Sequence, residues 1–248
     1  VGGGLHVQFY SYPTIMNSIF SFNQASNRGG GIYARFDTEL YIYKSTIVNN
    51  ELTGNGGFPP NDCNMGFSGL EGGGIFMEGG GINSTILWNN FPYQICAVPQ
   101  VGGMWGLGIE NSDIQGGFEN ITGSTIYIGY AYNIEEAPVF VDADNQNFNL
   151  SSISPCIDMG QFIWSGYGYN LFPEVNDYYG NAPDIGAFEF SYESGDINTD
   201  EIIDILDLVL LVNLILNPEE YYPFSDVNGD GIVNVLDIIL VLNIILNN

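Results

Sequence analysis

Two acidic segments near the C-terminal end carry the residues best suited to bind a metal ion. In residues 226–237, side-chain oxygens stand at positions 1, 3, 5, 9 and 12, and a glycine stands at position 6. A backbone carbonyl is available at position 7. Oxygen ligands at this spacing, with glycine at the sharp turn, suit a hard Ca²⁺ ion. The predicted ligands are Asp226, Asn228, Asp230, the Ile232 carbonyl, Asn234 and Asp237.

The same pattern occurs 30 residues earlier, in residues 196–207. Its predicted ligands are Asp196, Asn198, Asp200, the Ile202 carbonyl, Asp204 and Asp207. Glu201 replaces the glycine at position 6, and a side chain in a left-handed turn costs about 1 kcal/mol or more. Chance could produce a single Asp/Asn-rich turn of this spacing, but it does not account for two in matching register. We therefore expect two Ca²⁺ sites, of which the second is the stronger.

Each loop leads directly into an apolar segment, residues 206–216 and 236–246, which we predict to be helical. Both segments are hydrophobic nearly all round and are interrupted by only one Asp and one Asn each. A helix that is apolar on every face must be buried on every face, and two helices cover only one face of each other. A further apolar surface must therefore meet them, from the same chain, another copy or a partner protein.

This duplicated loop and helix resembles the dockerin type I family, whose paired F-hand loops end in an aspartate at position 12. The resemblance covers about residues 195–248 and implies a calcium-binding module that docks onto a cohesin-like protein. Dockerins often carry polar, cohesin-reading residues just before the closing aspartate. Here residues 205–206 and 235–236 are apolar. This departure favours docking onto the chain's own N-terminal part or onto a neighbouring copy.

Glycine-rich repeats fill the N-terminal part of the chain. They begin at GGGLHVQFY (2–10), GGGIYARFD (29–37) and GGGIFMEGGGI (72–82), with a degenerate copy at 106–117. Such self-similarity is typical of solenoids, whose units bury apolar faces only by stacking. No segment before residue 200 has a helical period. The repeats therefore predict stacked parallel strands. The expected inward columns contain Ile32, Ile47, Ile75 and Ile86.

From residue 111 onward, four blocks follow in order: NSDIQGG (111–117), NIEEAPVFVDADNQNFNL (133–150), SPCIDMG (154–160) and DYYGNAPDIGAFEF (177–190). With the repeats, they resemble a large family of secreted right-handed parallel β-helix proteins that includes bacterial surface proteins and adhesins. The resemblance implies a mainly β fold. Residues 1–190 would form the parallel β-helix, and residues 191–248 the small α-helical duplicated F-hand domain.

Two Gly/Pro-rich insertions interrupt the repeats at about residues 52–70 and 91–104. They are either recognition loops on a rigid scaffold or merely tolerated insertions. Each carries one cysteine, Cys63 and Cys96. Because the insertions leave adjacent repeats, these two cysteines are candidates for a disulfide. Cys156 is expected to be buried and unpaired.

The charge of the chain excludes several classes of partner. Its 248 residues include 3 basic and 29 acidic ones, giving a net charge of −26. Nucleic acids and anionic membrane surfaces require clustered Lys or Arg, so neither is expected as a partner. No apolar run approaches the roughly 20 residues that span a bilayer. This composition suits a secreted cation-binding protein, so we expect an extracellular or cell-surface location.

A polysaccharide lyase or hydrolase is the alternative function, because both occur on parallel β-helices. Such enzymes need a basic residue beside Ca²⁺ or clustered carboxylates. The local candidates are Arg35, Asp37, Glu39 and Lys44. Lys44 fills the slot of Asn17 and Asn83 in the neighbouring repeats, which favours a solvated repeat position over a catalytic one. We therefore expect no enzymatic activity and no catalytic residue.

The expected function is that of an extracellular structural or adhesive surface protein. The β-helix would be the scaffold, and the calcium-stabilised module would serve assembly or anchoring. Its partner would be a cohesin-like protein, or neighbouring copies joined head to tail into a filament, through residues 206–216 and 236–246. A glycan-binding module is a further alternative, since aromatic residues make up 14% of the chain. Aromatic side chains also fill solenoid cores.

Overall fold

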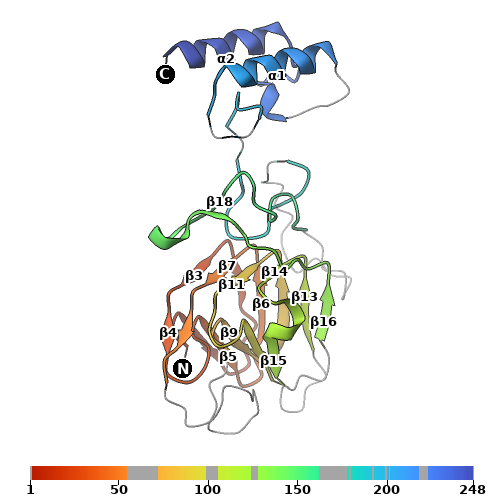
Figure 1. Ribbon diagram of the computed structural model, residues 1–248. Helices are drawn as coiled ribbons and strands as arrows, with labels where there is room; N and C mark the ends of the chain where they lie inside the picture. The colour runs from red at the N-terminus through yellow and green to blue at the C-terminus, as the bar shows by residue number, and fades with distance from the viewer. Residues whose placement is uncertain are drawn as a thin grey trace. The chain divides into compact units, whose positions relative to one another are not determined.

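The computed structural model describes residues 2–54, 72–98, 106–123, 128–161, 178, 180–191, 193–198, 200, 202–217 and 223–247. The chain divides into two compact units, Val1–Glu189 and Phe190–Asn248. We refer to them as the N-terminal unit and the C-terminal module and describe each by itself (Figure 1).

Short strands in three parallel sheets build the N-terminal unit (Figure 1). The first sheet has the order β1 (Leu5–Gln8), β5 (Ile32–Arg35), β9 (Ile75–Met77), β12 (Ile95–Ala97) and β15 (Ile121–Gly123). The second has the order β16 (Ile128–Ala131), β13 (Leu107–Glu110), β10 (Gly79–Asn83), β6 (Glu39–Tyr43) and β2 (Thr14–Met16). The third has the order β14 (Asp113–Ile114), β11 (Ile86–Trp88), β7 (Thr46–Val48) and β3 (Ile19–Ser21).

Two further strand pairs complete the unit. Strands β4 (Gln24–Ala25) and β8 (Glu51–Leu52) pair in parallel. Strands β17 (Phe140–Asp142) and β18 (Asn147–Leu150) pair antiparallel around the 3₁₀ turn η2 (Ala143–Asn145). A second 3₁₀ turn, η1 (Gly117–Asn120), precedes β15. No α-helix occurs before residue 205 in the described ranges, so the prediction of a mainly β N-terminal part is confirmed.

The pairing register follows the sequence repeats. Residues in the first two repeats pair 27 positions apart in all three sheets: Leu5 with Ile32, Thr14 with Tyr41, and Ile19 with Thr46. Equivalent side chains of successive repeats therefore lie beside one another. Strands of only two to five residues become stable because each repeat supplies the hydrogen-bonding partners of the next.

The inward side chains of the three sheets form one apolar core. Ile32 and Ile75 are paired and fully buried within it, as predicted. Ile47, however, pairs with Leu87 and not with Ile86, so Leu87 takes the inward position. Ile86 is buried on the outer side instead, where its Cδ1 lies next to Gly186. Alignment of KSTI (44–47) with NSTI (83–86) places Ile47 beside Ile86, but the strands pair one residue further along the third repeat. Ile86 was therefore wrongly predicted as an inward residue.

The Asn-Asn pairs that punctuate the repeats have a defined role. The first residue of each pair, Asn49 and Asn89, adopts a left-handed backbone conformation. The second residues form a ladder with Asn23, which follows Phe22 at the equivalent place in the first repeat: Asn23 Nδ2 donates to Asn50 Oδ1 (2.9 Å), and Asn50 Nδ2 donates to Asn90 Oδ1 (2.8 Å). Asparagine tolerates the left-handed turn and satisfies the buried polar groups beside it. The turn and the ladder together explain why the dipeptide recurs.

The SPCID and APDIGAF blocks contact each other and cover the outer face of the third sheet. Ile185 N donates to the Cys156 carbonyl (2.9 Å), and Ala187 N donates to Thr46 Oγ1 (3.0 Å). This cover buries hydroxyl side chains that would otherwise face solvent, including Thr46. Cys156 is buried with a free thiol, as predicted.

The predicted insertions are only partly described. Ile95–Ala97, within the second insertion, is not a loop but strand β12 of the first sheet. The prediction of an uninterrupted loop over residues 91–104 was therefore wrong for this segment. Cys96, on that strand, is disulfide-bonded, while Cys63 lies outside the described residues.

The C-terminal module contains two helices, α1 (Ile205–Leu216) and α2 (Val235–Asn247), within its described residues (Figure 1). Each begins one residue before its predicted start. Their contact is centred on Leu211 and Val241, and the loop residue Ile197 joins this small core. The 3₁₀ turn η3 (Pro223–Ser225) precedes the second loop. Among the described residues, no helix has the length and apolar character needed to cross a membrane.

Candidate metal centre

The two predicted calcium loops are each organised around the aspartate at position 12. Asp207 Oδ1 accepts hydrogen bonds from the backbone N–H groups of Ile197 (2.7 Å) and Asn198 (3.0 Å). Its Oδ2 accepts from Asp204 N (2.8 Å). The side chain is fully buried. The carboxylate therefore ties the start of the loop to the start of helix α1, which closes the loop.

Asp237 has the same role in the second loop. Its Oδ1 accepts from Asn228 N (3.1 Å) and its Oδ2 from Asn234 N (2.8 Å), and it is also fully buried. These contacts join positions 3 and 9 to position 12, as in the first loop. The two loops thus share one backbone arrangement, which matches the 30-residue spacing of their sequences.

Side chains at positions 1 and 5 bend each loop inward. Asp200 N donates to Asp196 Oδ1 (3.2 Å), and the equivalent Asp230 N donates to Asp226 Oδ1 (3.1 Å). The position-5 carboxylates then accept from the N–H groups of position 7, at 2.9 Å in the first loop and 2.8 Å in the second. Aspartate and asparagine favour such local turns because a short side chain reaches the backbone two to four residues away.

Position 9 of each loop is also the N-cap of the following helix. Asp204 Oδ1 accepts from Leu206 N (2.7 Å), and Asn234 Oδ1 accepts from Leu236 N (2.8 Å). Asp204 and Asp207 together form a capping box, which satisfies N–H groups that the helix cannot bond itself. The predicted ligand and the helix start are therefore the same residue, so the loop and the helix depend on each other.

The glycines of the second loop stand where the turn requires them. Gly229 and Gly231 have positive φ values of 72° and 83°, and Gly231 N donates to Asp226 Oδ2 (2.6 Å). Glycine adopts this backbone without steric cost. Glu201, the corresponding residue of the first loop, lies outside the described residues. The predicted strain at that position stays a prediction.

The donor set of both loops fits a hard cation. All the predicted ligands offer oxygen: carboxylates, amide oxygens and one carbonyl per loop. Within the part of the chain that the structure describes, no three His, Cys, Asp or Glu side chains converge as a metal-binding group. The carboxylates bond to loop N–H groups instead of crowding together. Assignment of the twelve residues as ligands therefore stays a prediction that rests on oxygen chemistry and spacing.

The basic residues considered for catalysis are held in ion pairs. Lys44 is buried and pairs with Glu189, so its interpretation as a solvated position was wrong. By register it lies level with Asn17 and Ser84 rather than Asn83. Arg35 Nε lies 3.3 Å from Glu78 Oε1. Sequence reasoning missed Glu78 and Glu189, because only the fold brings them to these cations.

Comparison with known families identifies the C-terminal module. The family model for the dockerin type I domain matches residues 194–246. The match spans both loops and nearly all of both helices. Searches of curated proteins and of solved structures gave no significant match. The predictions of a dockerin-like module and of calcium binding are supported by this family match, which leaves the N-terminal unit unassigned.

Proposed function

We propose that this chain is a component of an extracellular, cohesin-based assembly, in which the C-terminal module docks onto a cohesin and the N-terminal unit is the part displayed. The observation that carries the proposal is the dockerin type I match over residues 194–246. Domains of this class bind calcium and cohesins, and the oxygen-rich loops described above suit the metal. We assign one Ca²⁺ ion to each loop.

The exposed surface of the two helices supports docking. Six side chains of α1 and the six equivalent side chains of α2, 30 residues on, are exposed despite being large and apolar. They are Ile205, Leu206, Val209, Leu210, Val212 and Leu216, and Val235, Leu236, Ile239, Leu240, Leu242 and Leu246. Extended apolar surface of this kind marks an interaction site in a soluble protein. The partner must present an apolar surface of its own.

For the N-terminal unit we propose a right-handed parallel β-helix that acts as a structural or adhesive scaffold. Its support is the repeated 27-residue register in all three sheets and the single core that they share. We assign the unit no catalytic role, because Arg35 and Lys44, the basic residues of the candidate group, each face a carboxylate. Incubation with a panel of neutral and uronic-acid polysaccharides should release no products.

Binding to immobilised type I cohesins, with and without EGTA, tests the docking proposal. The full chain should bind at least one cohesin in calcium and lose it in EGTA. The double substitution Leu206→Asp/Leu236→Asp should weaken binding at least about 100-fold, because it places charge in the apolar contact. The control Val141→Asp/Ile153→Asp changes two exposed apolar residues of the N-terminal unit and should leave binding unchanged.

Equal binding by both double variants would overturn the assignment of the docking surface. Sedimentation of the full chain in calcium addresses the alternative of head-to-tail self-assembly, which no comparison supports. A concentration-dependent polymer that Leu206→Asp/Leu236→Asp dissolves would make a second copy the occupant of the helices. A monomer that binds a cohesin agrees with our proposal.

A further inference from the structure

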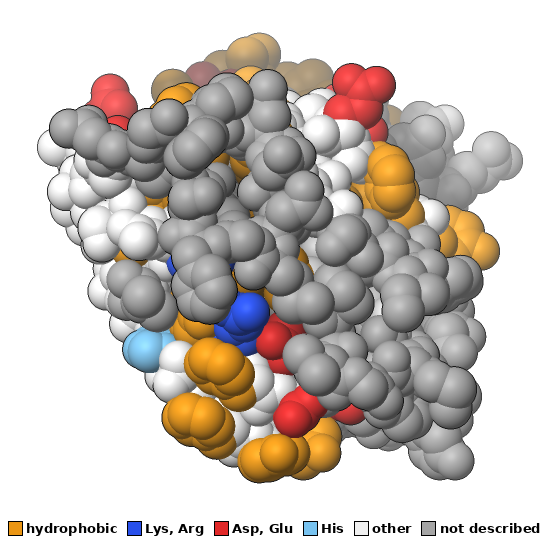
Figure 2. Space-filling view, turned by 90° about the horizontal axis from the view of Figure 1, so that it is seen from below, with side chains coloured by type: hydrophobic (Ala, Val, Ile, Leu, Met, Phe, Trp, Pro, Cys, Tyr) orange, Lys and Arg blue, Asp and Glu red, His pale blue; other side chains and the backbone are white. Residues whose placement is uncertain are grey.

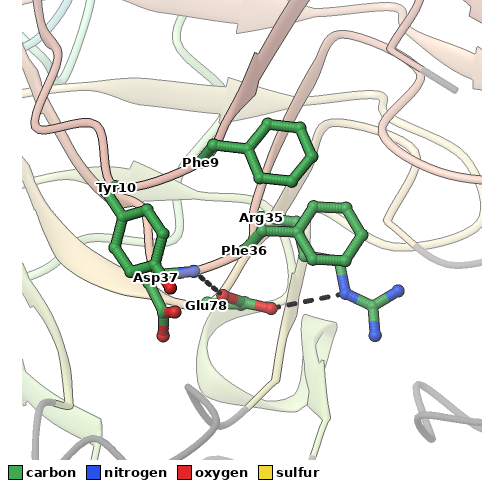
Figure 3. Close-up of a pocket in the computed structure, with 6 residues that line it drawn as sticks. All are labelled: Phe9, Tyr10, Arg35, Phe36, Asp37 and Glu78. Atoms are coloured by element: carbon green, nitrogen blue, oxygen red, sulfur yellow. Dashed lines mark hydrogen bonds and ion pairs between the residues drawn. The ribbon is translucent and has the colours of Figure 1, made fainter.

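A hollow in the N-terminal unit lies at the corner between the first and second sheets. It has a volume of about 210 Å³ and is lined by Phe9, Tyr10, Arg35, Phe36, Asp37 and Glu78 (Figure 3). None of these residues belongs to the calcium loops or to the docking helices. The hollow therefore belongs to a different unit from the site proposed above.

The hollow forms where the third repeat has a short connection between the first sheet and the second. Ile32 of β5 pairs with Ile75, 43 residues on, whereas Glu39 of β6 pairs with Gly79, only 40 residues on. The third repeat therefore passes from the first sheet to the second with three fewer residues. Glu78 is the single residue left between β9 and β10. The missing backbone leaves space beside the corners of the first two repeats.

The corners of those two repeats hold an unusual backbone. Phe9, Tyr10, Phe36 and Asp37 all have positive φ, from 54° to 64°. Residues with a side chain reach this left-handed region at a cost of roughly 1–2 kcal/mol each, and bulky aromatic residues rarely occupy it. Glycine or asparagine would relieve the strain. Strained residues occur at ligand clamps and also at other turns of this unit, such as Tyr132, so the case for a ligand rests on the side chains of the hollow.

The strained corners present aromatic surface to solvent. Phe9, Tyr10 and Phe36 are 64%, 74% and 42% exposed. The Phe9 and Phe36 rings stack with centroids 5.2 Å apart and planes within 11°. In Figure 3 the Tyr10 ring lies to one side of Glu78 and the two Phe rings lie to the other. Figure 2 shows hydrophobic side chains gathered beside basic and acidic ones on this side of the molecule.

The hollow is lined by two carboxylates, of which only one is engaged by neighbouring groups. Glu78 is 2% exposed and is fully engaged: its Oε1 faces Arg35 Nε at 3.3 Å, and its Oε2 accepts from Asp37 N at 2.9 Å. The Asp37 carboxylate accepts no hydrogen bond from any described residue. It is therefore available to accept hydrogen bonds from a ligand, while the Arg35–Glu78 pair adds no net charge.

We propose that this hollow binds one neutral pyranose unit of an extracellular glycan. A pyranose offers an apolar C–H face, which stacks on an aromatic ring, and hydroxyl groups, which donate to a carboxylate and accept from a guanidinium. The hollow is smaller than the roughly 300–1,000 Å³ of pockets for drug-sized ligands. It therefore suits a single sugar ring at a chain end or branch.

Charge and ring geometry disfavour two other classes of ligand, uronates and quaternary ammonium compounds. A uronate would meet the Asp37 carboxylate within a chain of net charge −26, so repulsion disfavours it. A quaternary ammonium is usually enclosed by aromatic faces. Here the two Phe rings are parallel, and the Arg35 guanidinium already lies 5.2 Å from the centroid of Phe36. Neither anion nor cation fits as well as a neutral sugar.

A glycan array, followed by titration calorimetry with the best neutral oligosaccharide, tests the proposal on the full chain in calcium. Tyr10→Ala removes a ring, and Asp37→Asn removes the carboxylate charge while retaining size and tolerance of positive φ. Each should weaken binding at least about tenfold. The control Tyr132→Ala alters a tyrosine with the same 74% exposure and a similar φ of 57° outside the hollow, and it should bind like the parent chain.

Circular dichroism melting of the three variants confirms that each one folds. Loss of affinity in Tyr10→Ala and Asp37→Asn but not in Tyr132→Ala supports the proposal. Absence of neutral-glycan binding, equal effects of all three substitutions, or preference for uronate or choline ligands would overturn it. Leu206→Asp/Leu236→Asp should still bind the oligosaccharide, so failure of cohesin docking and failure of sugar binding are distinguishable.

Discussion

The two units of this chain differ in how fully they bury their large apolar side chains. In the N-terminal unit, the stacked strands bury theirs against one another, and Ile32, Ile42 and Ile82 are fully buried. In the C-terminal module, two short helices share one seam around Leu211 and Val241 and leave twelve large apolar side chains exposed. The first unit stabilises itself by repetition, whereas the second has only this small core and its ordered loops.

The two units also differ in how far apart along the chain their hydrogen-bonded residues lie. The sheets of the N-terminal unit join residues 20 to 43 positions apart, and the side-chain ladder from Asn23 to Asn50 and Asn90 spans similar distances along the chain. In the C-terminal module, the loop bonds join residues within one twelve-residue segment. Local bonds order a loop without fixing it to a large core. We therefore expect the stability of the module to respond most strongly to a bound ion.

The largest expected effect is a pH dependence confined to the N-terminal unit. Asp113 is fully buried on β14, with Cys156 Sγ donating to its Oδ2 at 3.3 Å. Burial, reinforced by the negative charges of Glu136 and Glu135, raises its pKa from 3.8 to about 7. Between these values the folded state binds more protons than the unfolded state, so the free energy of unfolding falls as pH rises from 4 to 7.

This loss amounts to on the order of 4 kcal/mol. Asp113→Asn should remove that part of the pH dependence and stabilise the unit above pH 7. Urea denaturation at pH 4, 5.5, 7 and 8, followed in the parent chain and in the variant, measures the effect. An identical slope in both proteins would show that Asp113 is not the responsible group.

A matched pair of truncations compares the two apolar arrangements directly. Ile42→Ala in the N-terminal core should cost about 2–5 kcal/mol, because it leaves a cavity among well-packed neighbours. Leu242→Ala changes an exposed residue on α2 and should cost less than about 0.5 kcal/mol in the free chain. The affinity for a cohesin should show the opposite order: Leu242→Ala should weaken cohesin binding, and Ile42→Ala should not. A large loss of stability in free Leu242→Ala would contradict this comparison.

Calcium should stabilise the C-terminal module and not the N-terminal unit. A ligand that binds only the folded state adds about 2.7 kcal/mol at 100 times its Kd. We expect Asp226→Ala to lower the thermal midpoint of the module in calcium more than Asp196→Ala, because the second loop has glycine at its turn. Differential scanning calorimetry with calcium and with EGTA gives both midpoints. Identical traces in the two conditions would refute the metal assignment.

The smallest effect separates the capping role of position 9 from its role as a ligand. Asp204→Ala should destabilise the metal-free module by about 1 kcal/mol, since α1 loses its N-cap. Asp204→Ser retains a capping oxygen but not the carboxylate. It should therefore leave the metal-free module unchanged while weakening calcium binding to the first loop. Equal calcium affinity in Asp204→Ser and the parent chain would leave Asp204 with the capping role alone.

The sequence by itself determined the elements whose signals are local. Residue spacing within twelve positions gave the two loops, and continuous apolar segments gave α1 and α2 to within one residue at their starts. The glycine-rich repeats predicted parallel pairing and the buried pair of Ile32 and Ile75. Local turn chemistry and periodicity carry this information because they depend on neighbours along the chain.

Tertiary structure alone decided which side chains face inward and which distant groups meet. A one-residue slip in the third repeat exchanges Ile86 for Leu87 in the core, because successive side chains of a strand point to opposite faces. Lys44 meets Glu189, 145 residues away, only where the closing segment covers the sheet. Glu78 reaches Arg35 and Asp37 because a corner is three residues shorter. Such contacts depend on register between repeats, which no single repeat encodes.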